Sequence, residues 1–164
     1  MSVALWRIAL ASRTILSTDL SGRGAERSGG RWNSAGKPVV YTSSSIALAY
    51  LETVVHLNTG GLPLNRVLER IDVPDVVWAR RLSLPITALA DGWNALPVRP
   101  ASAEAGNTWL DGLASSLLVA PSGTVPEEFN VLLNPRHADA LKLTALALRP
   151  WTYDARLHAA RARF

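Results

Sequence analysis

The residues best suited to chemistry lie between positions 29 and 52. Gly29 and Gly30 precede Arg31, and Tyr41 follows at the end of a short apolar run. Paired glycines let a backbone approach a ligand closely, a guanidinium can contact phosphate or ribose through two nitrogens, and a tyrosine ring offers a face to a flat heterocycle. Together these residue types predict a nucleotide pocket.

This segment does not follow the common nucleotide-binding motifs. Lys37 is followed by Pro38, so no Gly-Lys-Ser/Thr sequence completes a Walker loop, and the glycines at 22–24 are not extended into the dinucleotide fingerprint. Trp32 lies inside the same polar segment and could line the pocket, whereas the other tryptophans are expected in the core. A pocket of a different kind is therefore predicted.

One carboxylate can join this group. Glu52 lies in a predicted helix over residues 46–57, near the edge of the apolar stripe of that helix. One strand and one helix could bring it to Arg31 and Tyr41. A carboxylate beside a guanidinium and an aromatic ring can stabilise an oxocarbenium-like ribosyl cation while nicotinamide leaves. The alternative interpretation is a solvated glutamate on a helix surface.

Other polar residues give weaker signals. Ser122 follows an apolar run and precedes Gly123. Its hydroxyl could bind a ligand, but it lacks the surroundings of a nucleophile, and by spacing alone it resembles a turn residue. Glu127 and Glu128 form a second, lower-ranked carboxylate candidate. No metal site is expected, because the three histidines are far apart and lack neighbouring acidic ligands. These are His56, His137 and His158.

The composition predicts one packed domain over residues 1–164, because 48% of the residues are hydrophobic and only 18% are charged. The absence of cysteine excludes disulfide scaffolds, zinc ribbons and thiol catalysis, and it favours a cytoplasmic location. No signal peptide or membrane span is predicted. The whole net charge of +4 falls within residues 1–40, which suits a phosphate-bearing ligand or an acidic partner.

The elements that must position these residues are mostly strands. We expect strands at 3–8, 38–41, 64–73, 76–78, 117–120, 131–133 and 141–148, helices at 46–57 and 101–116, a stop at 58–63 and at most two helical fragments over 82–100. The range 64–78 predicts a hairpin, and the Gly-, Ser- and Arg-rich range 17–37 predicts a long functional loop. The mixture predicts an α+β fold with twisted, partly antiparallel sheets.

The order of these motifs resembles that of the RES-domain toxins, a family named for a spaced Arg, Glu and Ser. The resemblance spans nearly the whole chain. It is carried by the segments 5–8, 24–25, 29–33, 36–41, 47–52, 121–130, 132–137 and 154–157. Three features depart from the pattern: the segment 97–106 is polar and variable-looking, Phe129 stands where a more polar residue is expected, and residues 158–164 extend past the last motif.

The resemblance implies roles for four residues. Arg31, Glu52 and Ser122 match the family's three defining positions, and Tyr41 matches an aromatic residue of the pocket. It also implies an ADP-ribosyltransferase-like fold, with two small twisted sheets around a cleft and flanking helices. Family members act on NAD, which is the substrate, so no separate cofactor is expected.

For substrate binding, we expect Arg31, with help from Arg7 or Lys37, to bind the pyrophosphate or the adjoining ribose of NAD. Tyr41 would stack on nicotinamide, and Ser122 would orient the substrate by hydrogen bonding. Asn130, in the Ser-containing segment, is a further candidate contact to NAD.

The reaction and the partners stay open at this stage. Family members either consume NAD by hydrolysis or phosphorolysis, or transfer ADP-ribose to a protein. The resemblance also implies an antitoxin with a helix-turn-helix DNA-binding region that blocks the cleft, and a homodimer within the toxin–antitoxin complex. A different alternative is a nucleic-acid-binding module in which Glu52 is structural. It is disfavoured because the excess cations are confined to one segment and no aromatic residues alternate with them.

Overall fold

The structure is a computed structural model that describes residues 1–14, 16–56, 62–98 and 100–157. The strands are β1 (Ser2–Leu10), β2 (Val40–Ser43), β3 (Arg66–Pro74), β4 (Leu82–Ser83), β5 (Leu117–Pro121), β6 (Phe129–Leu133) and β7 (Thr144–Pro150). The α-helices are α1 (Arg23–Ser28), α2 (Ile46–Val54), α3 (Asp75–Trp78) and α4 (Pro100–Gly112). Short 3-10 turns occupy Ile86–Ala88 and Ala138–Lys142. The α+β class expected from the sequence is confirmed.

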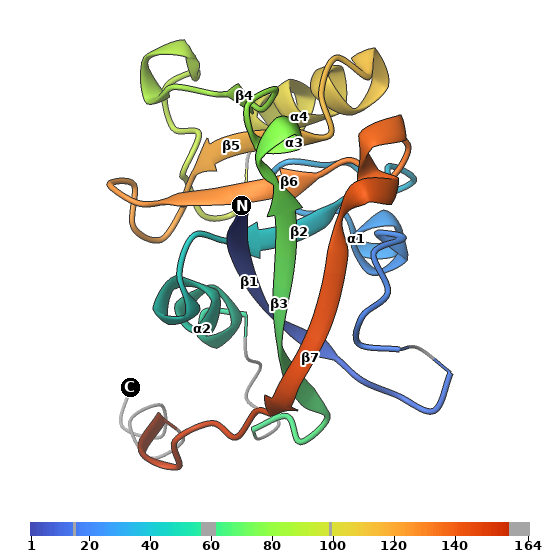
Figure 1. The fold of residues 1–164 in the computed structure, drawn as a ribbon. Helices are drawn as coiled ribbons and strands as arrows, with labels where there is room; N and C mark the ends of the chain where they lie inside the picture. The colour runs from blue at the N-terminus through green and yellow to red at the C-terminus, as the bar shows by residue number, and fades with distance from the viewer. Residues whose placement is uncertain (15, 57–61, 99, 158–164) are drawn as a thin grey trace.

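The strands form one sheet in the order β4-β5-β6-β2-β1-β3-β7. All neighbouring strands are antiparallel except β4 and β5. The sheet has two halves, because β1 and β2 share the single register pair Trp6 and Ser43. In Figure 1, β2, β5 and β6 run across the direction of β1, β3 and β7. The two small sheets expected from the resemblance are therefore joined at a narrow seam.

A separate hydrophobic cluster packs against each face of the sheet. Leu5, Val40 and Ile71 belong to a cluster on one face, and Tyr41, Leu118 and Leu132 belong to a second cluster on the other. The alternation follows from the period of two along each strand. Tyr41, Ser43 and Asn130 share the second face, because Ser43 and Asn130 are paired directly and Tyr41 lies two residues before Ser43.

Helix α2 directly follows β2 and brings Glu52 to this second face. The Ser45 side chain caps the helix by accepting a hydrogen bond from the Leu48 amide at 3.1 Å, a common N-cap interaction. Leu48 and Ala49 are buried, and α2 packs against β1 and β2 (Figure 1). The predicted helix ends at Val54, three residues before the expected boundary, and residues 57–61 lie outside the described part.

Several predicted elements differ from the structure. The hairpin over 64–78 is wrong, because β3 pairs with β1 and β7 while residues 76–78 lie in α3. Pro74 precedes this turn of helix and Asp75 stands in its first turn, where a carboxylate is favourable. The loop predicted over 17–37 contains the short helix α1.

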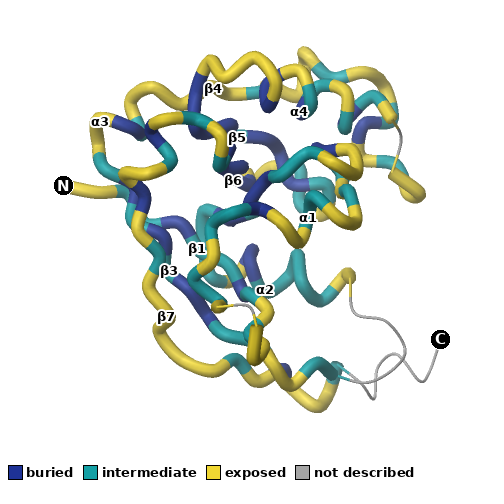
Figure 2. Tube along the Cα trace, turned by 90° about the vertical axis from the view of Figure 1, so that its right-hand side faces the viewer, coloured by how far each residue is buried: buried dark blue, intermediate teal, exposed yellow. Residues whose placement is uncertain are grey.

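The C-terminal part follows the sequence pattern more closely. Helix α4 ends at Gly112, before the predicted residue 116, and β7 is shifted toward the C-terminus of the predicted range 141–148. Strand β7 forms an edge of the sheet and is exposed over most of its length (Figure 2). Among the described residues, no helix is both long enough and apolar enough to cross a membrane.

Candidate functional site

The centre of the candidate site is the Glu52 carboxylate. Ser122 Oγ donates a hydrogen bond to Glu52 Oε1 at 2.6 Å, and Asn130 Nδ2 donates to the same oxygen at 2.8 Å. Hydrogen bonds to a carboxylate are short and strong because the acceptor is charged. In the described part of the chain they reach only Oε1, so Oε2 is left without a protein donor. Glu52 is thus held in place by the turn after β5 and by the start of β6, and it is not a solvated helix-surface residue.

Ser122 is both a turn residue and a donor to the carboxylate. It follows β5 and is fully buried. Its hydroxyl oxygen accepts hydrogen bonds from the Thr124 amide at 3.1 Å and the Val125 amide at 3.0 Å. Because both amides can only donate, the hydroxyl proton is left for Glu52. The turn interpretation and the binding interpretation therefore describe the same side chain.

Asn130 reaches Glu52 from the start of β6. The side chain is buried, and its Oδ1 accepts a hydrogen bond from Ser43 Oγ of the neighbouring strand at 2.8 Å. Ser43 was not among the sequence candidates. Nothing in the run of four polar residues at 42–45 distinguishes it, because only the pairing of β2 with β6 places it opposite Asn130.

Tyr41 is anchored through its hydroxyl. The hydroxyl donates to Asn33 Oδ1 at 2.7 Å and accepts from the Trp32 amide at 3.0 Å. Burial raises the pKa of Tyr41 to about 12, so the phenol is neutral at ordinary pH. The glycine at position 30 makes room for this hydroxyl, because a Cβ there would lie 2.7 Å from Tyr41 Oη. The space expected for a ligand at Gly30 is therefore occupied by Tyr41.

Asn33 was also missed by the sequence analysis, although it lies within the resemblance. It is buried, and its amide nitrogen donates to the carbonyls of Ala25, Ser34 and Lys37. The Asn33 side chain thus connects the loop residues around it and holds the Tyr41 hydroxyl in place. A polar residue with four partners of this kind is a conformational anchor.

Arg31 extends toward the Ser122 turn. Its Nη1 donates to the Trp93 carbonyl at 2.7 Å, and a Cβ on Gly123 would collide with its guanidinium. Burial lowers the pKa of Arg31, while the charges of Glu52 and of an ionised Tyr41 act in the opposite direction. The structure therefore brings Arg31, Tyr41, Glu52, Ser122 and Asn130 to one region of the sheet.

Arg7 does not join this group. It lies next to Trp6 in β1 and therefore points to the opposite face of the sheet, the face of Leu5. There Arg7 Nε donates to the fully buried Glu69 at 2.6 Å, and Nη2 donates to the carbonyls of Ser17 and Asp19. Its charge neutralises a buried carboxylate away from Glu52, so the expectation that Arg7 helps to bind pyrophosphate gains no support here and stays a prediction.

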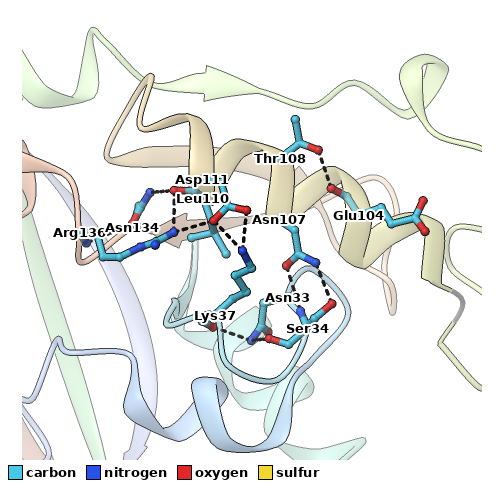
Figure 3. Close-up of polar contacts among 10 residues, drawn as sticks. All are labelled: Asn33, Ser34, Lys37, Glu104, Asn107, Thr108, Leu110, Asp111, Asn134 and Arg136. Atoms are coloured by element: carbon cyan, nitrogen blue, oxygen red, sulfur yellow. Dashed lines mark hydrogen bonds and ion pairs between the residues drawn. The ribbon is translucent and has the colours of Figure 1, made fainter.

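Lys37 is also engaged elsewhere. Its Nζ lies 2.6 Å from Asp111 on α4, and Arg136 binds the same carboxylate at 3.0 Å (Figure 3). Beside this cluster, the Asn107 side chain exchanges hydrogen bonds with the amide and hydroxyl of Ser34. In this structure Lys37 fastens the loop to α4, and its expected role in substrate binding stays a prediction.

The remaining candidates lie outside the group. Trp32 is buried against Trp93 with ring centroids 5.9 Å apart, so it belongs to the core. Glu127 and Glu128 are exposed on the turn before β6. No cluster of three or more metal-binding side chains occurs within the described ranges, and His158 lies outside them.

Two surface hollows also lie away from the five grouped residues. One, of about 270 Å³, is lined mainly by apolar residues between Leu20 and Leu143. The other, of about 250 Å³, borders Pro121 and Phe129 on the outer side of the Ser122 turn. The site is therefore defined by its converging polar groups rather than by a hollow.

This arrangement can stabilise a cation next to an anion-binding group. Glu52 supplies the negative charge, Arg31 supplies the positive charge, and Tyr41 supplies a neutral ring. Ser122 and Asn130 donate hydrogen bonds to one carboxylate oxygen, and among the described residues no donor reaches the other, which can face a ligand. Electrostatic groups held in fixed positions of this kind favour a transition state that develops charge.

The chain is similar over most of its length to several proteins named as toxins. The chain is 49% identical over 157 residues to the Prs ADP-ribosylating toxin of a Sphingobium species, covering 96% of this chain and 98% of that protein. It is 39% identical over 155 residues to Toxin Res of Pseudomonas putida, with 93% and 98% covered. It is 36% identical over 133 residues to Toxin Res of Yersinia enterocolitica, with 81% and 84% covered.

The fold is similar to that of a chain in the crystal structure of the M. tuberculosis MbcT-MbcA toxin-antitoxin complex, with a TM-score of 0.68, 20% identity, and 99% of this chain and 90% of that chain covered. This likeness confirms the ADP-ribosyltransferase-like fold expected from the sequence. The RES domain matches residues 4–156, which include Arg31, Glu52 and Ser122. With these matches, the chain belongs to the RES domain family.

Proposed function

We propose that this chain is the toxin of a toxin–antitoxin pair and that it cleaves the N-glycosidic bond between nicotinamide and ribose in NAD. The observation that carries the proposal is the Glu52 carboxylate, held by Ser122 and Asn130 through one oxygen, while no described residue donates to the other. The names of the relatives support the toxin role, because the chain matches three proteins named as toxins over most of their length.

In this reaction the bond between C1′ of the ribose and the ring nitrogen breaks, and its electron pair stays with nicotinamide. The positive charge moves from the pyridinium ring to the ribose, where Glu52 Oε2 stabilises it. Arg31 binds the pyrophosphate or the adjoining ribose, and the neutral Tyr41 ring packs against nicotinamide. Water or phosphate then adds to C1′ and loses a proton, which depletes NAD.

The direct test compares nicotinamide release from NAD by the wild type and the Glu52→Gln variant. The amide keeps the size of the side chain but removes its charge, so we expect kcat to fall about 10²-fold or more. Glu127→Gln is the matched control, because Glu127 is exposed on the turn before β6 and should leave the rate unchanged. Equal release by Glu52→Gln and the wild type would exclude the assignment.

A second candidate is transfer of ADP-ribose to a protein. It is favoured by the 49% identity to a relative named as an ADP-ribosylating toxin. NAD labelled in its adenylate part distinguishes the two reactions. Label in soluble ADP-ribose, or in its phosphate ester when phosphate is added, supports NAD consumption. Label bound to protein in a cell extract supports transfer, provided that Glu52→Gln abolishes it.

We further propose that the toxin is inhibited by an antitoxin partner that covers the site. The structural neighbour, crystallised as a toxin-antitoxin complex, supports this proposal. The helix-turn-helix region of the antitoxin and the homodimer stay predictions. Nucleic-acid binding is not carried forward, because Arg7 and Lys37, two of the N-terminal cations, are engaged in ion pairs within the chain.

A further inference from the structure

We propose that Ser43 is a positioning residue for the reaction, acting on Glu52 through Asn130. The inference rests on the proposed function, since it assumes that the Glu52 carboxylate faces the substrate. Ser43 Oγ donates to Asn130 Oδ1 at 2.8 Å, and Asn130 Nδ2 donates to Glu52 Oε1 at 2.8 Å. A hydroxyl on β2 is thereby connected to the carboxylate through one amide.

The chemistry of the three groups allows only this direction of hydrogen bonding. A carboxylate accepts hydrogen bonds, so the NH₂ side of the Asn130 amide must face Glu52. The carbonyl side of the amide then faces Ser43, whose hydroxyl must donate. If the amide turned over, its oxygen would lie beside the carboxylate oxygen, and two acceptors would repel each other. The Glu52 carboxylate therefore selects the amide orientation, and Ser43 supports that selection by donating to the amide oxygen.

Burial makes this selection effective. Ser43 is 4% exposed and Asn130 is 8% exposed, so water has little access to replace either partner. A buried amide oxygen that loses its donor keeps the cost of desolvation. An Asn130 side chain without Ser43 would therefore hold Glu52 less firmly.

The backbone around Ser43 fixes the hydroxyl in space. Ser43 is paired with Asn130 of β6 on one side and with Trp6 of β1 on the other, at the seam between the two halves of the sheet. Two residues later, Ser45 caps the helix that carries Glu52. The Ser43 hydroxyl, the Asn130 amide and the start of α2 are thus all positioned by the same part of the sheet.

The expected effect is on kcat rather than on KM. Asn130 and Ser122 both bind Oε1, so a loose amide changes the direction of Oε2 and its contact with the charge that develops in the transition state. Binding of the adenylate part of NAD depends on other groups. A merely structural role of Ser43 would lower the stability without separating kcat from KM.

The main experiment compares Ser43→Thr with Ser43→Val in the full chain, with nicotinamide release from NAD as the readout. The two side chains have the same shape and differ in the hydroxyl alone. We expect kcat of the Val variant to be about tenfold below that of the Thr variant, the effect of one lost hydrogen bond, with similar KM. Equal kcat values, or a difference confined to KM, would overturn the proposal.

Thr42→Val is the control for loss of a buried hydroxyl on the same strand. Thr42 is 2% exposed and donates to the Val131 carbonyl at 2.6 Å, on the face of β2 opposite Ser43. Its removal should lower stability and leave kcat unchanged. If Thr42→Val lowered kcat as much as Ser43→Val, the effect would be a general loss of packing, and the proposal would fail.

A double-mutant cycle tests the route through Asn130 without adding bulk at the seam. Ser43→Ala should lower kcat in the wild type but have no further effect in an Asn130→Ala chain. Independent, multiplicative effects of the two substitutions would contradict the inference. Failure of the proposed function is recognised separately, because Glu52→Gln would then release nicotinamide at the wild-type rate.

Discussion

Tyr41 shows how one side chain of the site depends on its immediate partners. Its hydroxyl is engaged in both directions, as a donor to Asn33 and as an acceptor from the Trp32 amide. The raised pKa means that it remains a neutral phenol, so it serves through its ring and its position and not as an acid or base. The same hydroxyl therefore helps to hold the loop before β2 in its conformation.

Tyr41→Phe should destabilise the protein by about 1–3 kcal/mol at pH 8, because it leaves Asn33 Oδ1 and the Trp32 amide without this partner. Tyr153→Phe is the control: its hydroxyl is buried without a partner among the described residues, so its removal should cost little. Urea unfolding of both variants measures the difference. A loss for Tyr153→Phe equal to that for Tyr41→Phe would contradict the explanation.

The raised pKa of Tyr41 also predicts that the stability of the protein depends on pH. The Tyr41 phenol ionises at about pH 10.0 when unfolded and at about 12 when folded. Between these values the unfolded chain binds fewer protons, so wild-type stability falls as pH rises. Phenylalanine lacks this effect, and the gap between Tyr41→Phe and the wild type should narrow from pH 8 to pH 11. An unchanged gap would show that the folded-state pKa is not raised.

Among the elements, the loop before β2 and helix α4 are packed unusually closely. Gly106 of α4 lies directly against the Trp32 carbonyl, where a Cβ would overlap the oxygen. Ion pairs at Lys37 and hydrogen bonds at Ser34 fasten the same loop further along the helix (Figure 3). The helix thus supports the loop that carries Arg31.

Gly106→Ala should force α4 and the loop apart and destabilise the protein by at least about 1–3 kcal/mol. Gly112→Ala, in the same helix, meets nothing within 4 Å and should be neutral or slightly stabilising. Thermal unfolding compares the two variants. Because Arg31 belongs to the loop that would move, KM for NAD should also rise in Gly106→Ala. Equal behaviour of the two alanine variants would contradict the close approach.

Asp111→Asn tests the ion pairs that fasten this loop. Hydrogen bonds from Lys37 and Arg136 lower the pKa of Asp111 below its ordinary value of 3.8. Its contribution is therefore present above pH 3.8 and is lost as pH falls through the lowered pKa. The Tm of the variant should lie slightly below that of the wild type at pH 7, and the gap should close in acid and in high salt. Asp91→Asn, an exposed aspartate outside this cluster, should show no such gap.

For the whole molecule, the sequence indicated which candidate residues lie together better than it indicated the contacts that hold them. The strands around positions 3–8, 117–120 and 131–133 follow from apolar runs, and Arg31 and Glu52 from their place in the pattern. The ion pairs of Arg7 and Lys37 were not predicted, because the sequence alone does not show which acidic residue a cation will meet. Glu69 and Asp111, which bind them, lie 62 and 74 residues away.

Ser43 and Asn33 could not be predicted for the same reason. Their importance arises from strand pairing and from loop closure, which become visible only when distant segments meet. The hairpin at 64–78 was wrong because local alternation favoured pairing with the next segment, whereas β3 lies between β1 and β7. Local patterns gave the class of each element, and long-range pairing decided its neighbours.

The pairing of β2 with β6 determines when, during synthesis, the groups around Glu52 can be assembled. Ser122 and Asn130 lie 70 and 78 residues after Glu52 in the chain, so a nascent polypeptide that already displays Arg31, Tyr41 and Glu52 lacks both donors. Cell-free translation products ending at residue 121 should accordingly release no nicotinamide, whereas full-length product should. Under the proposed function, a growing chain therefore consumes no NAD until Ser122 and Asn130 have been added and β6 can pair with β2.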